Sequence, residues 1–302
     1  MRRLLPVLGA LIMTLLATSA ARAAPGSTHS AQSSLQATLS QDMGNIGGAS
    51  GALVVDLSTG KTLYSDQAGT RRLPASVEKI YTTSAALLRF GPSATLSTTV
   101  YGQGWLGGKG IWHGTLYLRG GGDPTFGTAG FIGSAYGGSG SSVETLASHL
   151  RSSGIRGVVG RVVGDESYFD SLRGTSESGY QFDHYMAGSL SALAFNRGTR
   201  ADGMSYLYHP AVYAAQQLVS ALQGAGVKVS ASTGTGQTPK SAQQLAVVQS
   251  PPMSRLVALT NTPSDNFFAE MLIKDLGAKF GAAGTTAAGA GVVIALLGRR
   301  FG

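Results

Sequence analysis

The chain has 302 residues, of which 43% are hydrophobic and 13% charged, so it is long and apolar enough to bury a core. It contains no cysteine, which excludes disulfides and metal–thiolate sites. The net charge is +8, but the basic residues are scattered without a Lys/Arg cluster, so nucleic-acid binding is not expected. The five histidines lack ligand-like spacing, and we expect no metal.

The N-terminus has the pattern of an export signal. A basic start, Arg2-Arg3, precedes an apolar run from Leu4 to Leu16 that is short for a membrane span. Ala21-Arg22-Ala23 has the small-x-small form of a cleavage site. We predict a signal peptide over residues 1–23 and a mature protein in the periplasm or the extracellular cell-wall space. An uncleaved anchor is the alternative. Cleavage would remove three arginines and no acids, which lowers the net charge to +5 (8 − 3).

The residues after this signal predict a linker, a helix and a hairpin. Residues 24–34 are small and polar, and we expect a linker there. Gln36 to Met43 predicts a short helix. Residues 51–57 and 61–65 read as strands joined by the turn Ser58-Thr59-Gly60, which predicts a β-hairpin.

The stretch Pro74–Tyr81 carries the first candidate for chemistry. Ser76 and Lys79 are three residues apart at the start of an apolar-periodic run that ends at Gly91-Pro92, so we predict a helix with both side chains on one face. A serine hydroxyl needs a neighbouring base to act as a nucleophile, and a desolvated lysine can be that base. The alternative is a serine N-cap beside a solvated lysine, since composition alone gives roughly one S-x-x-K match.

The middle of the chain alternates strands and helices between Gly-rich turns. This pattern favours an α/β-like module. Strands are predicted at 98–101, 114–119, 156–165 and 227–230, helices at 143–152 and 210–223, a turn at Gly120–Pro124, and a Gly/Thr-rich loop at 232–241.

An irregular segment and three helices complete the pattern. The aromatics Tyr180, Phe182, Tyr185 and Phe195 either line a substrate groove or pack under a long loop, which is the commoner arrangement. Helices are predicted at 254–259 and at 285–297. A further helix is predicted to begin directly after Ser264-Asp265-Asn266, and Gly277 can cap its C-terminal end. The second site candidate is Ser264-Asp265-Asn266, for which a simple N-cap is the alternative.

The order S-x-x-K on one helix and S-D-N before another is a signature of penicillin-recognising serine enzymes. Longer stretches of the chain resemble the penicillin-binding protein 4 type of D-alanyl-D-alanine carboxypeptidase/endopeptidase, a low-molecular-mass class C penicillin-binding protein. The stretches that carry this resemblance are the hairpin 51–65, Leu73–Lys79, Leu116–Phe126, Val163-Gly164-Asp165 and Ser264–Glu270.

The resemblance implies an α+β fold. A penicillin-binding/β-lactamase-like transpeptidase lobe would be split between residues 35–96 and 251–302, with an inserted α/β-like module at 97–250. It also implies a serine D-Ala-D-Ala carboxypeptidase that acts on peptidoglycan stem peptides, is acylated by β-lactams, and uses no metal or organic cofactor.

The resemblance also implies residue roles. Ser76 would attack the substrate carbonyl and Lys79 would take its proton. Ser264 would relay a proton to the leaving amine, and Asn266 would bind the substrate amide and help to orient Lys79. The Ser76 backbone N–H would supply half of an oxyanion hole.

One motif of the family has no counterpart. A K-T-G or K-S-G is expected on a strand after S-D-N, but Lys274 and Lys279 are the lysines that follow Asn266, and neither precedes Thr-Gly or Ser-Gly. We therefore expect a truncated, incomplete enzyme that lacks this strand.

A class A β-lactamase is the obvious rival, and two other interpretations stay open. A class A β-lactamase also carries S-x-x-K and S-D-N, but there the two motifs lie close together, whereas Ser76 and Ser264 are 188 residues apart (264 − 76). A β-lactamase-like hydrolase in the broader sense is one alternative function. A peptidoglycan-binding module without turnover is another.

Overall fold

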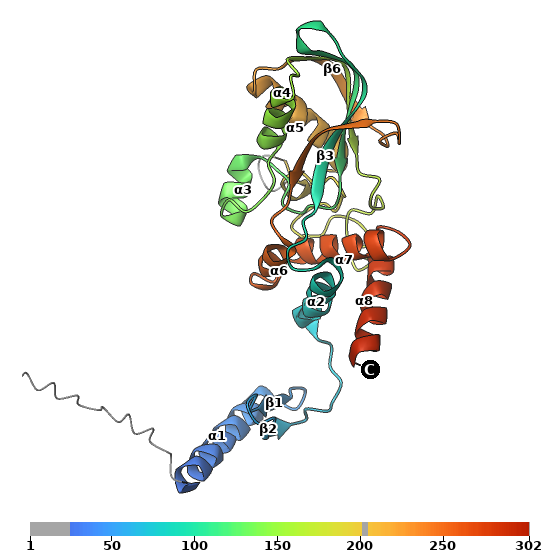
Figure 1. Ribbon diagram of the computed structural model, residues 1–302. Helices are drawn as coiled ribbons and strands as arrows, with labels where there is room; N and C mark the ends of the chain where they lie inside the picture. Colours follow the sequence, from blue (N-terminus) through green and yellow to red (C-terminus); the bar gives the residue numbers. More distant parts are fainter. Residues whose placement is uncertain (1–24, 201–204, 302) are drawn as a thin grey trace, which may run out of the picture. The chain divides into compact units, whose positions relative to one another are not determined.

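The computed structural model describes residues 25–200 and 205–301 (Figure 1). Within the described chain, the contacts separate two compact units, one ending at Leu73 and the other beginning at Pro74. The predicted signal peptide, residues 1–23, lies outside the described residues. The predicted split into a lobe of 35–96 plus 251–302 and an insert of 97–250 stays a prediction.

The first unit combines one helix with a hairpin. Helix α1 (Pro25–Ile46) lies against β2 (Thr62–Asp66), which pairs antiparallel with β1 (Ala52–Val55). The predicted hairpin is therefore confirmed. The Asp56 carboxylate holds its turn by accepting from Ser58 N–H (2.9 Å) and Ser58 Oγ–H (2.6 Å). These hydrogen bonds and the one from Thr59 Oγ–H lower the pKa of Asp56 to about 2.

The start of α1 corrects the prediction of a linker at 24–34. Residues 25–46 form one helix, so the helix predicted at 36–43 extends by more than two turns toward the N-terminus. The small polar residues of this stretch include no proline after Pro25 and no glycine between 27 and 43, so nothing interrupts the helix. A proline is tolerated at the first helical position because its N–H would have no helical partner there.

The second unit is built on a mixed sheet. The described part of this sheet has five strands in the order β6-β5-β4-β3-β7. Strand β3 pairs antiparallel with both β4 and β7, whereas β4, β5 and β6 run parallel. The strands are β3 (Ser97–Leu106), β4 (Ile111–Gly120), β5 (Gly157–Asp165), β6 (Lys228–Thr235) and β7 (Gln243–Gln249).

Helices α4 (Val143–Ser152) and α5 (Pro210–Gly224) provide the parallel crossovers and pack together on the sheet (Figure 1). They enclose a buried core that includes Leu116, Leu146, Leu150, Val158, Val162 and Leu218. The sequence predicts both helices almost to the residue. It misses α3 (Ala129–Tyr136) and β7, and it places a loop at 232–241 where β6 continues to Thr235.

Four further helices form a second packed group. They are α2 (Lys79–Phe90), α6 (Met253–Asn261), α7 (Asn266–Phe280) and α8 (Thr286–Phe301). Helix α7 crosses the ends of α2 and α8 in Figure 1 and contacts both. Its buried Phe267, Phe268, Met271 and Leu272 pack with Met253 and Leu256 of α6.

Helix α7 does not end at Gly277 as predicted but runs on to Phe280, and Gly281 follows it. A side chain at Gly277 would lie 2.6 Å from the Ala283 carbonyl oxygen and 2.8 Å from the Gly289 nitrogen. This glycine therefore permits close approach of α8, whereas the sequence pattern indicated a helix cap. Across residues 25–200 and 205–301, no helix has the length and apolar character needed to span a membrane.

Candidate active site

The structure brings Ser76, Lys79 and Ser264 together. The Lys79 Nζ lies 3.0 Å from Ser76 Oγ and 3.3 Å from Ser264 Oγ. Ser76 and Ser264 are exposed, and Lys79 is half-buried. One amine therefore contacts two hydroxyls at a surface that a substrate can reach. This is the arrangement that lysine-assisted serine chemistry requires.

The backbone around Ser76 explains its exposure. Ser76 is the second residue of a 3₁₀ helix, η1 (Ala75–Glu78), which runs directly into α2, whose first residue is Lys79. Ala75 is left-handed, with φ of +47°. Such a conformation is costly for alanine and occurs preferentially at functional sites.

Ser264 has the same unusual backbone. Its φ is +59°, in the turn between α6 and α7. Two hydrogen bonds close that turn: Ser264 N–H donates to the Asn261 carbonyl (3.3 Å) and Asp265 N–H to the Thr260 carbonyl (2.8 Å). The side chain of Asn261 in turn donates to Thr83 Oγ of α2 (3.2 Å), which ties the turn to the helix that carries Lys79.

Asp265 and Asn266 have different partners. Asp265 caps α7 by accepting from Phe268 N–H (3.0 Å), so the N-cap interpretation holds for this residue. Asn266 Nδ2 donates to the Tyr185 carbonyl (2.8 Å). Within the described residues Asn266 has no hydrogen bond to Lys79, and its predicted contribution to orienting that lysine stays a prediction.

Arg197 is a residue at this site that sequence reasoning missed. Its guanidinium forms a two-pronged ion pair with the Asp265 carboxylate, at 2.6 and 3.1 Å. It also lies over the Phe267 ring, 4.8 Å from the centroid. Because the two residues of the ion pair are 68 positions apart, no local pattern could have indicated it.

The four aromatics of the irregular segment divide into two groups. Phe195 is buried in the core beside the sheet, and Phe182 packs against Tyr206 and Tyr208 with ring centroids 5.6 and 4.4 Å away. Tyr180 and Tyr185 are exposed by 45% and 80%. The packing alternative therefore holds for the two phenylalanines.

Lys274 is buried and forms an ion pair with Asp170. Its Nζ donates to Asp170 Oδ1 at 2.8 Å, so its charge is already paired. Lys279 is exposed in the last turn of α7. The predicted absence of a K-T-G contribution stays a prediction. In the described residues, no group of three or more His, Asp or Glu side chains is placed to hold a metal.

Two buried carboxyls lie where α7 meets the Gly120–Pro124 turn. Burial raises the pKa of Asp123 to about 6, although Ser141 and Thr125 donate hydrogen bonds to it. Burial and the proximity of Asp123 raise the pKa of Asp275 well above its usual range. Among the described residues neither carboxyl oxygen of Asp275 has a hydrogen-bond partner.

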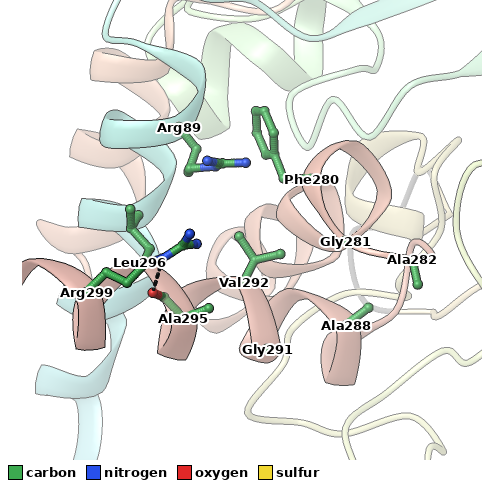
Figure 2. Close-up of a pocket in the computed structure, with 10 residues that line it drawn as sticks. All are labelled: Arg89, Phe280, Gly281, Ala282, Ala288, Gly291, Val292, Ala295, Leu296 and Arg299. Atoms are coloured by element: carbon green, nitrogen blue, oxygen red, sulfur yellow. Dashed lines mark hydrogen bonds between the residues drawn. The ribbon is translucent and has the colours of Figure 1, made fainter.

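A groove lies between α2, α7 and α8, away from Ser264. Figure 2 shows Arg89 and Phe280 on one side of it and Val292, Leu296 and Arg299 of α8 on the other. The Arg89 guanidinium lies over the Phe280 ring, 4.4 Å from its centroid. Phe280 ends the helix that Asn266 begins, roughly 20 Å away at 1.5 Å per residue, so the groove is separate from the two serines.

A family comparison decides the family of the chain. The model of the D-Ala-D-Ala carboxypeptidase 3 (S13) family matches residues 31–199 and 197–302. The chain belongs to this S13 family. The family resemblance read from the sequence is therefore confirmed.

Individual relatives of this S13 chain also have the names of carboxypeptidases. It is 34% identical over 157 residues to a D-alanyl-D-alanine carboxypeptidase of Actinomadura sp. strain R39, covering 52% of this chain and 27% of the relative. It is 28% identical over 234 residues to carboxypeptidase DacB of Mycolicibacterium smegmatis, covering 76% and 48%. The chain thus spans at most about half the length of the curated relatives that it matches.

The fold of the S13 chain is that of a solved penicillin-binding protein. Penicillin binding protein 4 from Haemophilus influenzae superposes with a TM-score of 0.66 at 17% identity, covering 83% of this chain and 67% of that one. The same protein complexed with a β-lactam gives a TM-score of 0.57 at 16% identity, covering 82% and 66%. The predicted α+β, penicillin-binding type of fold is therefore confirmed.

Proposed function

We propose that this chain carries the nucleophile of a serine D-Ala-D-Ala carboxypeptidase and that this nucleophile is Ser76. The observation that supports the proposal most is the position of Lys79 Nζ, 3.0 Å from one serine hydroxyl and 3.3 Å from another. Membership of the S13 family supports the substrate class that we propose, a peptidoglycan stem peptide that ends in D-Ala-D-Ala.

Each proton in the reaction has an assigned path. Lys79 takes the Ser76 proton while Ser76 Oγ bonds to the carbonyl carbon of the penultimate D-Ala. The C–N bond then breaks, and the proton passes from Lys79 through Ser264 Oγ to the leaving amine of the terminal D-Ala. Water hydrolyses the resulting ester and regenerates Ser76.

Two further groups of the protein are proposed to bind the substrate. The Ser76 N–H lies in the first turn of η1 and α2, where backbone N–H groups lack helical partners, so it is available to a developing oxyanion. One such donor contributes roughly 3–4 kcal/mol to transition-state stabilisation. Asn266, beside Ser264 at the start of α7, would bind the substrate amide.

β-Lactams are proposed as covalent inhibitors. A structural neighbour of this chain has been solved with a β-lactam bound. A β-lactam presents a strained amide carbonyl to the same nucleophile, and ring opening leaves the amine tethered to the acyl group. Action on peptidoglycan would also require export, and we propose a location in the periplasm or the extracellular cell-wall space, with cleavage of a signal peptide near Ala23.

Acylation by a labelled penicillin tests the proposal. The full chain should gain the mass of one opened penicillin on the peptide that contains Ser76. Ser76→Ala should abolish the gain, whereas Ser84→Ala, a control on α2, the helix that follows η1, should leave it intact. A parent chain that is not acylated, or is acylated elsewhere, contradicts the proposal.

Further assays separate the alternatives. Release of D-Ala from a pentapeptide supports the carboxypeptidase. Rapid release of hydrolysed penicillin would instead identify a β-lactamase-like hydrolase. Cell-wall binding that survives Ser76→Ala, in a chain without any hydrolysis, would identify a binding module.

A further inference from the structure

We propose that Arg197 is a positioning residue, which fixes the Ser264–Asn266 turn against Lys79 without touching substrate. The inference rests on the proposed function, because it assigns to that turn the proton relay and the substrate amide contact. Its basis is the set of contacts that Arg197 and its loop make with this turn.

The first contact is the ion pair. Arg197 and Asp265 are 15% and 17% exposed, and both guanidinium nitrogens of the fork reach the carboxylate. A fork-to-fork pair fixes orientation as well as distance. Asp265 directly follows Ser264, so the pair fixes the backbone on which the Ser264 hydroxyl is mounted.

The guanidinium is itself held on its other edges. Its Nε donates to the Ala187 carbonyl (2.9 Å), and a terminal nitrogen reaches the Met186 carbonyl (3.4 Å). Its flat face covers the ring of Phe267, the residue after Asn266. Opposing contacts on edge and face leave the guanidinium little freedom to move.

The backbone that carries Arg197 is equally constrained. Asn196 and Arg197 are both left-handed, with φ of +49° and +62°. The Asn196 side chain accepts from Thr128 N–H (2.9 Å), and the Arg197 carbonyl accepts from Ser189 N–H (2.9 Å). Strain of this kind persists where surrounding structure enforces it, which favours a functional requirement for this geometry.

The same loop also holds Asn266, because the Tyr185 carbonyl accepts from its side chain at 2.8 Å. Asp265 and Asn266 are thus both bound by the segment 185–197. Among the described residues, Arg197 has no hydrogen bond to Ser76 or Lys79. Its influence on them therefore passes through the turn.

Arg173 offers a matched control. It forms the same kind of two-pronged pair with Glu166, at 2.9 and 2.7 Å, and the two residues are 14% and 23% exposed. It also donates to a loop carbonyl, that of Leu190. It differs from Arg197 in having no contact with the Ser264–Asn266 turn within the described residues.

The decisive experiment separates binding of a labelled penicillin from acylation in the full chain. Arg197→Ala should lower the acylation rate constant by about 10- to 100-fold, as expected for a small misplacement of reacting groups, with the binding constant nearly unchanged. Arg197→Lys should recover part of that loss, because it restores the charge without the fork. Arg173→Ala should leave the rate constant within about threefold of the parent, corrected for the folded fraction.

A second measurement, hydrogen exchange, does not depend on acylation of the protein. Hydrogen exchange at the amides of residues 264–268 should accelerate in Arg197→Ala and not in Arg173→Ala. Unchanged exchange there, or equal acylation rates in the two alanine variants, overturns the proposal for Arg197. If the parent is not acylated the proposed function fails, and the exchange measurement alone then decides the positioning by Arg197.

Discussion

At the scale of residues, the central feature is one amine between two hydroxyls. Lys79 is the first residue of α2, and Ser76 precedes it by three positions, so their proximity follows from helical geometry. Ser264 lies in a turn 185 positions after Lys79 in the sequence. The pairing of Ser76 with Lys79 could be predicted from spacing, whereas the position of Ser264 depended on the resemblance to a family.

Replacement of Lys79 tests its function as the base. Lys79→Ala should lower the rate of penicillin acylation by about 10²- to 10⁴-fold, the usual contribution of a positioned base. The measurement is the acylation rate at Ser76, with circular dichroism to verify folding. Lys279→Ala, which removes an exposed lysine from the end of α7, should leave the rate unchanged. A comparable loss in both variants would contradict the assignment.

The buried carboxyl of Asp275 should make stability depend on pH. Its pKa is raised in the folded state by burial and by Asp123, so the folded protein keeps a proton that the unfolded chain loses above about pH 4. The contribution of Asp275 to stability is therefore fully present below that pH and is lost as the pH rises through the raised pKa of the folded state. Asp275→Asn, which needs no such proton, should raise the melting temperature at about pH 8 and change it little at about pH 4.

The control for this prediction is Asp42→Asn, which alters an exposed carboxylate on α1. It should leave the difference in melting temperature between the two pH values as in the parent. A melting temperature for Asp275→Asn that is lower than that of the parent at both pH values would show that the carboxyl makes favourable contacts in the folded state.

At the scale of elements, glycine sets how closely α7 and α8 pack. A side chain at Gly289 would overlap the carbonyl oxygen of Ile273, and one at Gly277 would crowd the start of α8. Gly289→Ala should therefore destabilise the fold by about 1–3 kcal/mol, the usual cost of overpacking. Urea unfolding measures this free energy.

Gly291→Ala is the matched control in the same helix. A side chain there meets no atom within 4 Å. Better helix propensity should then stabilise the chain by up to about 1 kcal/mol. If the two substitutions change the free energy of unfolding in the same direction, close packing of the two helices is not what Gly289 provides.

The elements also show where sequence reasoning succeeds. Helix α4 has an N-cap serine, Ser142, and clear apolar periodicity, and its predicted bounds at Val143 and Ser152 are confirmed. Helix α3 has an equally good cap in Thr128 and a left-handed stop at Gly137, but glycines within and around it conceal the pattern. Strand β7 has an apolar run, Leu245–Val248, without polar alternation, and this run does not indicate its pairing with β3.

Arg197 marks the limit of prediction for the site. A single arginine in an irregular, Gly-containing loop carries no local pattern, and its partner Asp265 reads as an ordinary helix cap. The two are joined by the fold alone. Sequence reasoning therefore reaches the residues of a motif more easily than the residues that hold the motif in place.

At the scale of the whole molecule, the chain should be cut first where its two compact units join. The segment 67–74 has no regular helix or strand over most of its length, and Leu73 is 95% exposed. Limited thermolysin digestion, read by mass spectrometry, should give a first cleavage in this segment. A first cut within 97–250 would contradict this expectation.

Leu57 supplies the control for cleavage at Leu73. It is also 95% exposed, but it lies in the hairpin turn that the Asp56 carboxylate holds through hydrogen bonds. Leu73→Ser should slow the first cleavage, whereas Leu57→Ser should not. Equal slowing would mean that exposure alone, rather than backbone freedom, selects the site.

The contact between Lys79 and Ser264 has a consequence for biosynthesis. The two residues are 185 positions apart, which corresponds to roughly 10–40 s of ribosomal elongation. Throughout that interval the nascent polypeptide carries Ser76 and Lys79 without the second hydroxyl or the turn that holds it. The proposed chemistry would thus have to wait until the residues around Ser264 have been synthesised.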